Sequence, residues 1–246
     1  MAPMTRAQAI ADGLTRVRER IAAAERAAGR APGSVRLLAV SKKMTADDVR
    51  AALAAGQRAF GENYAQELRD KRAALAQDPM VAALPHPPEW HYIGPLQSNK
   101  IKYVAGQVAL AHTVDSAALL EAFEARGLPQ ACLVQVNVAG EAQKRGIAPA
   151  DLPGLLDRFA TMSHLTCAGL MVIPPFTENP DDARPHFAAL RALRDREAAI
   201  ARPQVELREL SMGMSGDLEA AIAEGATIVR VGTAIFGGRQ QRTVGV

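Results

Sequence analysis

The residue best suited to covalent chemistry stands where the first apolar run of the sequence ends. The run RLLAVS, residues 36–41, is followed at once by Lys42, and a helix start follows at Thr45. A lysine in such a place suits imine formation, because burial and nearby positive charge favour the neutral amine that attacks a carbonyl. A lysine whose stem covers apolar surface while its ammonium group stays in water explains the same pattern. Lys42 alone leaves both interpretations open.

Two stretches late in the chain predict a place for a phosphate group. LSMGMSGDLEA contains Ser211, and VRVGTAIFG contains Gly232 and Thr233, which open a helix. Small residues with free backbone N–H groups bind phosphate, and α/β barrels often hold one after their last two strands. Glycines that only form tight strand-to-helix turns are the structural alternative. An imine lysine together with an anion site is the combination that pyridoxal 5′-phosphate (PLP) needs.

Other chemically capable side chains also stand at the ends of apolar runs. They are Asn63, His91, Met171 and Arg230. Asn63 could equally cap the helix that follows it. The histidines His91, His112 and His164 are too scattered in the sequence to indicate a metal site, so no metal is expected.

Apolar periodicity predicts the elements that position these residues. The runs VRLLAV, CLVQVNV and TIVRVG are almost continuously apolar, which is typical of parallel strands covered on both faces. Strands are expected at 36–41, 57–61, 90–94, 108–112, 131–138, 166–173, 206–211 and 227–232. Eight strand–helix units in about 250 residues predict an α/β fold, a single (β/α)8 TIM barrel. An open doubly wound sheet is the alternative, although no GxGxxG follows the first strand.

The helical segments complete this organisation. Apolar residues recurring at three- and four-residue steps predict an extra N-terminal helix over about 4–29. The barrel is expected over about 35–238, so that 1–246 forms one PLP-binding domain. A capping box at Thr45, and Ser215 followed by acidic residues, predict helix starts between the strands.

Composition limits the classes of partner. The 29 basic and 26 acidic residues are well mixed and give a net charge of +3, so nucleic acid is not an expected partner. Cys132 and Cys167 lie in apolar runs, which indicates reduced thiols and a cytoplasmic protein. The N-terminus has no apolar signal core, and no window approaches eighteen apolar residues, so neither secretion nor a membrane is expected.

Seven motifs resemble one known family. LLAVSKK, FGENYAQE, WHYIGPLQSNK, VQVNVAGE, GLMVIPP, LSMGMSGDLEAAI and VRVGTAIFG are similar, in this order, to motifs of the YggS/PROSC family of PLP homeostasis proteins. The resemblance extends over about residues 35–238. It implies a barrel related to the N-terminal domain of alanine racemase, with PLP held as an imine.

The resemblance also implies a role for each candidate residue. The imine would form on Lys42, and Ser211 with the backbone of Gly232 and Thr233 would hold the phosphate. Arg230 would face the pyridine nitrogen. The ring would be lined by Asn63, His91 and Met171. Two loops depart from the family pattern: Gly216 stands where an acidic residue is common, and AGEAQKRG replaces a serine-containing loop. Lys144, which that loop keeps, could be a second amine near the pocket or a solvated lysine.

The same residues favour a carrier over an enzyme. A guanidinium at Arg230 cannot take up a proton, so the ring would stay unprotonated and be a weak electron sink. Related racemases use a second base on a C-terminal β-domain, and this chain ends eight residues after Gly238. We therefore expect a protein that stores PLP and releases it, possible recipients being apo PLP-dependent enzymes. The alternatives are a racemase with His91 or Tyr64 as second base and a cofactor-free aldolase that uses Lys42.

Overall fold

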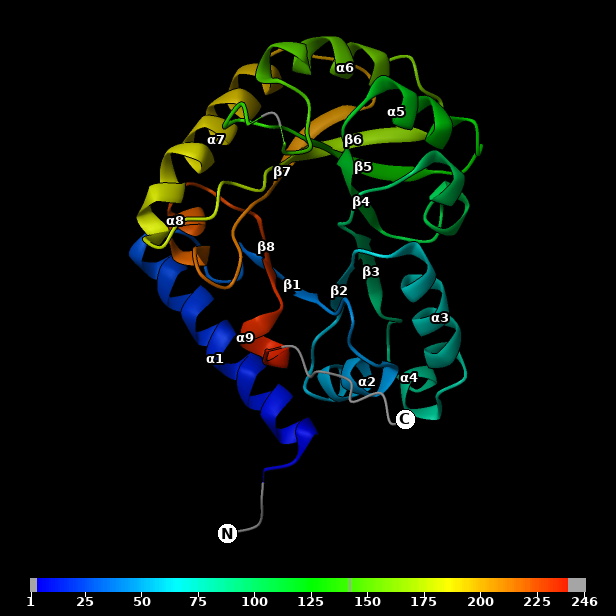
Figure 1. Ribbon diagram of the computed structural model, residues 1–246, viewed down its shortest axis with the longest axis vertical. Coiled ribbons are helices and arrows are strands. Elements are labelled where there is room, and N and C mark those ends of the chain that lie inside the picture. Colours follow the sequence, from blue (N-terminus) through cyan, green and yellow to red (C-terminus); the bar gives the residue numbers. More distant parts are fainter. Residues whose placement is uncertain (1–3, 142, 239–246) are drawn as a thin grey trace.

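The computed structural model describes residues 4–141 and 143–238, in which eight parallel strands close into a barrel (Figure 1). Each strand pairs with the next in the chain, and β8 pairs with β1. The strands are β1 (Arg36–Val40), β2 (Ala59–Glu62), β3 (Glu89–Tyr92), β4 (Leu110–Val114), β5 (Gln130–Gln135), β6 (Leu165–Met171), β7 (Val205–Ser211) and β8 (Ile228–Val231). The predicted TIM barrel is confirmed, and the open-sheet alternative is wrong because the sheet has no edge strand.

Helices connect the strands and cover the outside of the barrel. They are α2 (Ala46–Ala54), α3 (Ala65–Ala76), α4 (Pro79–Ala82), α5 (Ala117–Glu124), α6 (Leu152–Phe159), α7 (Arg184–Ala198), α8 (Leu218–Ala223) and α9 (Thr233–Phe236). The described residues also form three short 3₁₀ helices, which are η1 (Ser98–Tyr103), η2 (Pro149–Asp151) and η3 (Pro180–Ala183). None of the helices within the described residues is long and apolar enough to cross a membrane.

The two predicted helix starts have different outcomes. Thr45 caps α2 through a reciprocal capping box with Asp48, as expected. Ser215 does not begin α8, which starts at Leu218. The Asp217 carboxylate instead accepts the backbone N–H of Met214 at 2.6 Å, and Asp217 N–H donates to Met214 O at 3.3 Å. This turn leaves Ser215 at the tip of the loop after β7.

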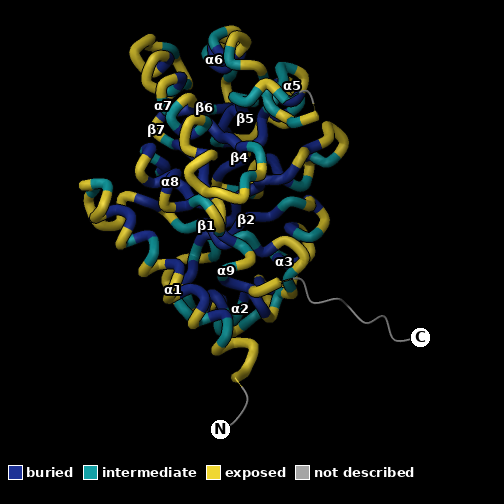
Figure 2. The backbone as a smooth tube through the Cα atoms, turned by 60° about the vertical axis from the view of Figure 1, so that its left-hand side comes forward, coloured by how far each residue is buried: buried dark blue, intermediate teal, exposed yellow. Residues whose placement is uncertain are grey.

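The apolar core has two layers, separated by the strands. Alternate side chains of each strand point into the barrel, where Leu38, Leu110, Leu133, Met171 and Ile228 form the inner layer. The opposite side chains form the larger layer between strands and helices. In Figure 2 most strand residues are accordingly dark blue, while exposed residues gather on loops and outer helix faces.

Both cysteines belong to the core. Cys132 and Cys167 are fully buried free thiols on β5 and β6. Burial raises the pKa of both thiols, that of Cys167 to about 12. Both side chains are therefore protonated at neutral pH and pack as small apolar groups, as the sequence predicted.

The N-terminal helix α1 (Arg6–Ala27) lies along α2, α8 and α9, which confirms the predicted extra helix (Figure 1). Thr5 and Gln8 form its capping box. At Gly13 the helix approaches α9 so closely that an added Cβ would lie 2.6 Å from Ile235 O. This contact places α1 directly against the segment that follows β8.

Gly13→Ala should therefore lower the free energy of unfolding by about 1–3 kcal/mol, because α1 must move away from α9. Gly154 in α6 is the matched control, since no atom lies within 4 Å of a Cβ added there. Gly154→Ala should raise the free energy of unfolding by about 0.5–1 kcal/mol through helix propensity. Urea unfolding followed by circular dichroism measures both. Equal effects of the two substitutions would contradict the close α1–α9 contact.

Candidate functional site

A cavity of about 430 Å³ opens at the carboxyl ends of β1, β2 and β8. This is the end of a parallel barrel at which ligands bind, and the volume suits a small cofactor. Five of the eight predicted site residues line it: Lys42, Asn63, Arg230, Gly232 and Thr233. The structure thus brings the predicted amine, the predicted ring contact and part of the predicted phosphate site into one cavity.

Lys42 reaches the cavity from a tight turn after β1. Met44 N–H donates to Ser41 O at 3.0 Å, and Lys43 between them has φ 63°, the left-handed conformation of a type II turn. Glu67 holds this turn by accepting the Lys43 N–H at 2.8 Å. Lys42 is exposed rather than buried, so its side chain is in contact with solvent. Its position leaves the side chain accessible to a ligand that enters the cavity.

A buried ion pair anchors the same turn from below. Lys71 of α3 donates from Nζ to Ser41 O at 2.6 Å and to Glu62 Oε1 at 2.7 Å. Ser41 Oγ donates to the same carboxylate oxygen at 2.6 Å. Burial raises the pKa of Glu62, and the nearby Lys71 charge opposes that rise. The position of Lys42 is therefore coupled to a charge pair between the barrel and α3.

Arg230 presents a buried positive charge to the cavity. It is 5% exposed, and its two Nη atoms donate to Ser211 Oγ at 2.7 Å and to Val172 O at 2.8 Å. No carboxylate of residues 4–141 or 143–238 forms a salt bridge with it within 4 Å; Asp217 acts on it only at longer range. Burial lowers the pKa of Arg230 to about 10, which still leaves it charged at neutral pH. Its remaining donors suit a ligand atom with a lone pair.

Ser215 and Thr233 form the polar side of the cavity opposite β2. Thr233 Oγ1 donates to Ser215 Oγ at 3.1 Å, and both residues line the cavity. The first backbone bonds of α9 run from Ile235 and Phe236 to Gly232 O, so the N–H groups of Thr233 and the next residue have no acceptor within the helix. Two hydroxyls and such N–H groups suit a phosphate.

Ser215 lines the cavity although the sequence did not indicate it as a phosphate ligand. The motif SMGMS holds two serines, and the sequence predicts the phosphate at the first one. Ser211 is fully buried as the last residue of β7, and it does not line the cavity. Because its side chain points into the barrel, it reaches Arg230 rather than the cavity surface. The presence of a second serine on the loop after the strand was the available signal.

His91 and Met171 also lie inside the barrel and outside the lining of the cavity. Both are fully buried. Both ring nitrogens of His91 have partners, Glu89 and His112. The assignment of these two residues to the ring wall rested on their places near strand ends, and the inward direction of their side chains was not visible in the sequence. Tyr64, by contrast, is exposed and lines the cavity.

Asn63 has a buried side-chain oxygen that can accept a hydrogen bond. Its backbone carbonyl accepts the Tyr92 hydroxyl at 3.0 Å, and Gly94 lies so near that an added Cβ would be 2.0 Å from Asn63 O. Its Oδ1 is buried and has no hydrogen-bond partner among the described residues. The capping alternative is wrong, because Tyr64 is the N-cap of α3 and makes no side-chain cap bond. A ligand donor would satisfy this oxygen.

Two arginines of α1 hold the far side of the cavity in place. Arg20 donates from Nη2 to Ser215 O at 3.0 Å, which fixes the loop after β7. Arg6 donates to Phe236 O at 2.7 Å and pairs with Asp48 of α2 at 2.7 Å. The N-terminal helix therefore positions both segments that would meet a phosphate.

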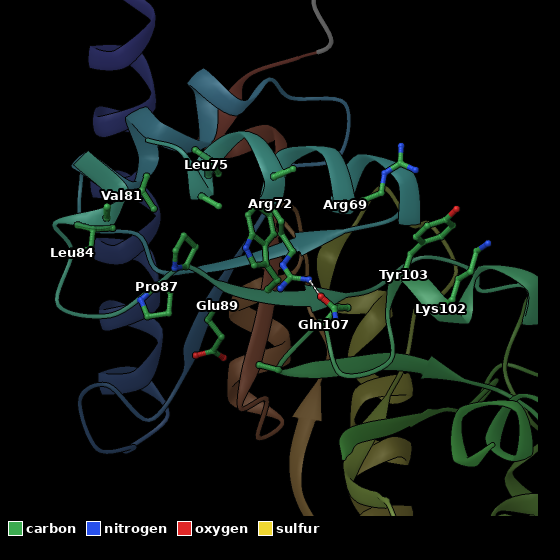
Figure 3. A pocket seen from close by; sticks show the side chains of 16 residues that line it. Arg69, Arg72, Leu75, Val81, Leu84, Pro87, Glu89, Lys102, Tyr103 and Gln107 are labelled. Atoms are coloured by element: carbon green, nitrogen blue, oxygen red, sulfur yellow. Dashed lines mark hydrogen bonds between the residues drawn. The ribbon is translucent and has the colours of Figure 1, made fainter. Parts of the chain in front are cut away.

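A second, larger cavity of about 770 Å³ lies between α3, α4, η1 and the start of β3 (Figure 3). Arg72 donates there to Gln107, and Trp90, Leu75 and Val81 form part of its apolar wall. None of the predicted site residues lines it. It is thus separate from the candidate site.

Two further features lie outside the candidate site. Lys144 donates from Nζ to Pro174 O at 2.8 Å and does not line the 430 Å³ cavity. In the part of the chain that the structure describes, no group of three or more His, Cys, Asp or Glu residues could hold a metal ion.

Sequence comparison decides the family. Residues 14–240 match the family model of the alanine racemase N-terminal domain. The chain is 46% identical over 235 residues to the pyridoxal phosphate homeostasis protein of Pseudomonas aeruginosa, an alignment that covers 94% of this chain and 96% of that protein. The chain belongs to the pyridoxal phosphate homeostasis protein family.

Solved structures agree with membership of this family. PipY of Synechococcus elongatus, determined with PLP bound, is 38% identical and has a TM-score of 0.78, covering 93% of this chain and all of PipY (100%). Alanine racemase of Corynebacterium glutamicum has a TM-score of 0.68 at 18% identity, covering 97% of this chain and 64% of the racemase. The second likeness shows the shared barrel fold.

The buried ion pair of Glu62 and Lys71 can be tested by comparing the unfolding free energies of single and double variants. Lys71→Met should lower the free energy of unfolding by about 3–5 kcal/mol, because Glu62 stays buried without its counter-charge. The double variant Glu62→Gln/Lys71→Met should recover much of that loss. Lys102→Met, at an exposed position, is the control and should change stability by less than about 0.5 kcal/mol. Urea unfolding measures all three, and a double variant no more stable than Lys71→Met would refute the coupling.

Proposed function

We propose that this chain binds PLP reversibly in the 430 Å³ cavity, holds its aldehyde as an imine on Lys42, and serves as a cytoplasmic PLP carrier. One observation carries the proposal: an accessible lysine, a buried guanidinium and a pair of hydroxyls face the same cavity. Membership of the pyridoxal phosphate homeostasis protein family and the PLP bound by PipY support it.

The residues fit the chemical groups of PLP one by one. Lys42 would supply the amine, and the donors of Arg230 would meet the lone pair of the ring nitrogen. Ser215, Thr233 and the free N–H groups at the start of α9 would hold the phosphate. The unpartnered Oδ1 of Asn63 would accept a hydrogen bond from the hydroxyl group of the ring. When bound, PLP supplies an aldehyde that condenses with amines and a ring that withdraws electrons.

Arg230 favours a carrier over a catalyst. A charged guanidinium cannot accept a hydrogen bond from a protonated ring nitrogen in the way a carboxylate can, so the site keeps the ring a weak electron sink. His91 is fully buried with both ring nitrogens bonded, which removes it from contact with an amino acid in the cavity. A non-enzymatic role, with release of PLP to apo-enzymes, is therefore the better proposal. Tyr64 is the residue left for the racemase alternative.

The exposure of Lys42 suits a carrier as well. Because the side chain is accessible, water or an incoming amine can reach Nζ without opening of the barrel. Meanwhile Ser41 and Lys43, whose backbone is fixed by Lys71 and Glu67, keep the turn in one conformation. The site thus combines a backbone turn of fixed conformation with an accessible amine, which favours loading and release of PLP over its retention.

Lys42→Ala should abolish the visible absorbance of the PLP-loaded protein, because it removes the proposed imine amine. Lys43→Ala is the matched control, since Lys43 lines the same cavity and is also exposed. Its visible band should persist. Borohydride reduction followed by peptide mapping should locate the modification on Lys42 in the parent protein. A Lys42→Ala protein that keeps the band would contradict the proposal.

The two serines of SMGMS can be distinguished by their effect on phosphate recognition. Ser215→Ala should weaken PLP binding by about tenfold, equivalent to one charge-assisted hydrogen bond, and leave pyridoxal binding unchanged. Ser211→Ala should alter PLP and pyridoxal binding alike, because Ser211 contacts Arg230 and not the cavity. Fluorescence titration with both ligands measures this. Loss of phosphate discrimination in Ser211→Ala alone would refute the assignment to Ser215.

A further inference from the structure

A chain of hydrogen bonds runs through the interior of the barrel to the candidate site. Glu89 Oε1 lies 2.6 Å from His91 Nε2, and His91 Nδ1 lies 2.8 Å from His112 Nε2. His112 Nδ1 lies 2.9 Å from Ser211 Oγ, which accepts from Arg230 Nη1 at 2.7 Å. The two histidines and the serine are fully buried, surrounded by the inner apolar layer.

Charge at the Glu89 end fixes the direction of this chain. The hydrogen bond from His91 lowers the pKa of Glu89, and Arg36 pairs with the same carboxylate at 3.1 Å. Because an ionised carboxylate can only accept, His91 must carry its proton on Nε2. At the other end Arg230 can only donate to Ser211 Oγ, so the hydroxyl proton of Ser211 goes to His112 Nδ1. His112 then donates from Nε2 to His91 Nδ1, which leaves His91 neutral.

The rest of the chain follows from the neutral state of His112. Burial holds the pKa of His112 well below its usual value. With its proton on Nε2, His112 accepts at Nδ1 from the hydroxyl of Ser211. The lone pairs of Ser211 are then free for Arg230, so every bond from Arg230 to Glu89 points the same way.

The opposite direction leaves groups unsatisfied. A proton on Nδ1 of His112 would make Ser211 accept from two donors, and its own hydroxyl proton would have no acceptor within the chain. The unprotonated Nε2 of a neutral His91 would face the carboxylate of Glu89. Two lone pairs in contact inside a barrel are unfavourable, so the native direction is the stable one.

We propose that Glu89, His91, His112 and Ser211 are positioning residues, which orient the Arg230 guanidinium from the opposite end of the barrel. Ser211 Oγ and Val172 O together fix two nitrogens of the guanidinium, which sets the donors left for the cavity. The effect on the cofactor ring rests on the proposed function. The direction of the chain does not, because it exists in the protein without ligand.

Glu89 makes the chain accessible to mutation. It stands at the amino-terminal end of β3, where it borders the larger cavity, and Figure 3 shows its side chain directed away from Arg72. Its side chain is 41% exposed, so its replacement does not disrupt the core. It lines no part of the 430 Å³ cavity.

The first measurement is histidine ¹⁵N NMR on the ligand-free protein. His91 and His112 should both be neutral and protonated at Nε2. Glu89→Leu removes the terminal acceptor, so each direction of the hydrogen-bond chain then leaves one donor unsatisfied, and a fraction of both rings should change to the Nδ1-protonated tautomer. Glu89→Gln, which keeps an acceptor oxygen, should retain the native tautomers. Nδ1 tautomers in the parent protein, or unchanged tautomers in Glu89→Leu, would overturn the proposal.

Glu209→Leu is the matched control. Glu209 pairs with Arg36 at 3.6 Å at the same end of the barrel and makes no contact with either histidine. Its replacement removes a carboxylate, one Arg36 contact and the acceptor of the Thr227 hydroxyl, but it leaves the chain of hydrogen bonds intact. Glu209→Leu should preserve both tautomers. A change of tautomer in this variant would show that charge at this end of the barrel, rather than the chain of hydrogen bonds, determines the tautomers of the two rings.

The second measurement uses PLP itself as the probe. Glu89→Leu should weaken PLP binding by about three- to tenfold and shift the visible band, whereas Glu89→Gln and Glu209→Leu should match the parent protein. Tautomers that change without any change in band or affinity would overturn the positioning role. A parent protein that binds no PLP would refute the proposed function, and the NMR result would still decide whether the chain has the stated direction.

Discussion

The charge of Arg230 is the constraint on which the site depends. A guanidinium inside a barrel is costly unless its donors are satisfied, and here a hydroxyl and a carbonyl satisfy two of its nitrogens without a carboxylate. An acidic partner would neutralise the charge and allow protonation of a bound ring. Neutral acceptors leave the charge directed to the cavity. The polar chain through the apolar interior follows from this requirement, because the Ser211 hydroxyl that accepts from Arg230 needs a buried acceptor for its own proton, and His112 provides one.

The two walls of the cavity are held by elements outside the barrel. On the Lys42 side, Lys71 of α3 donates to the carbonyl that begins the turn. On the opposite side, Arg20 of α1 donates to the carbonyl of Ser215. The strands alone would present these loops without fixing them. The distance between the amine and the hydroxyl pair therefore depends on two helix contacts, which explains why α1 is packed tightly enough to require Gly13.

The fold, and the meeting of five of the candidate residues in one cavity, could be predicted because they follow from local rules. Apolar runs give the strands, and parallel strands bring their carboxyl ends to one face. How deep each side chain lies within the barrel could not be predicted, because this depends on strand register and on the direction in which the side chain points. His91 and Ser211 were therefore assigned to the cavity although they lie beneath it. The pair of Glu62 and Lys71 has no sequence signature, because its members belong to different elements.

The central claim is that one cavity holds an amine on one wall and an anion site on the other, with Arg230 between them. A crystal structure of this chain grown with PLP tests it most directly. The account predicts continuous density from Lys42 Nζ to the cofactor, the phosphate on Ser215 and Thr233, and the ring nitrogen against Arg230. Density joined to Lys43 or Lys144, or a phosphate bound at Ser211, would contradict it.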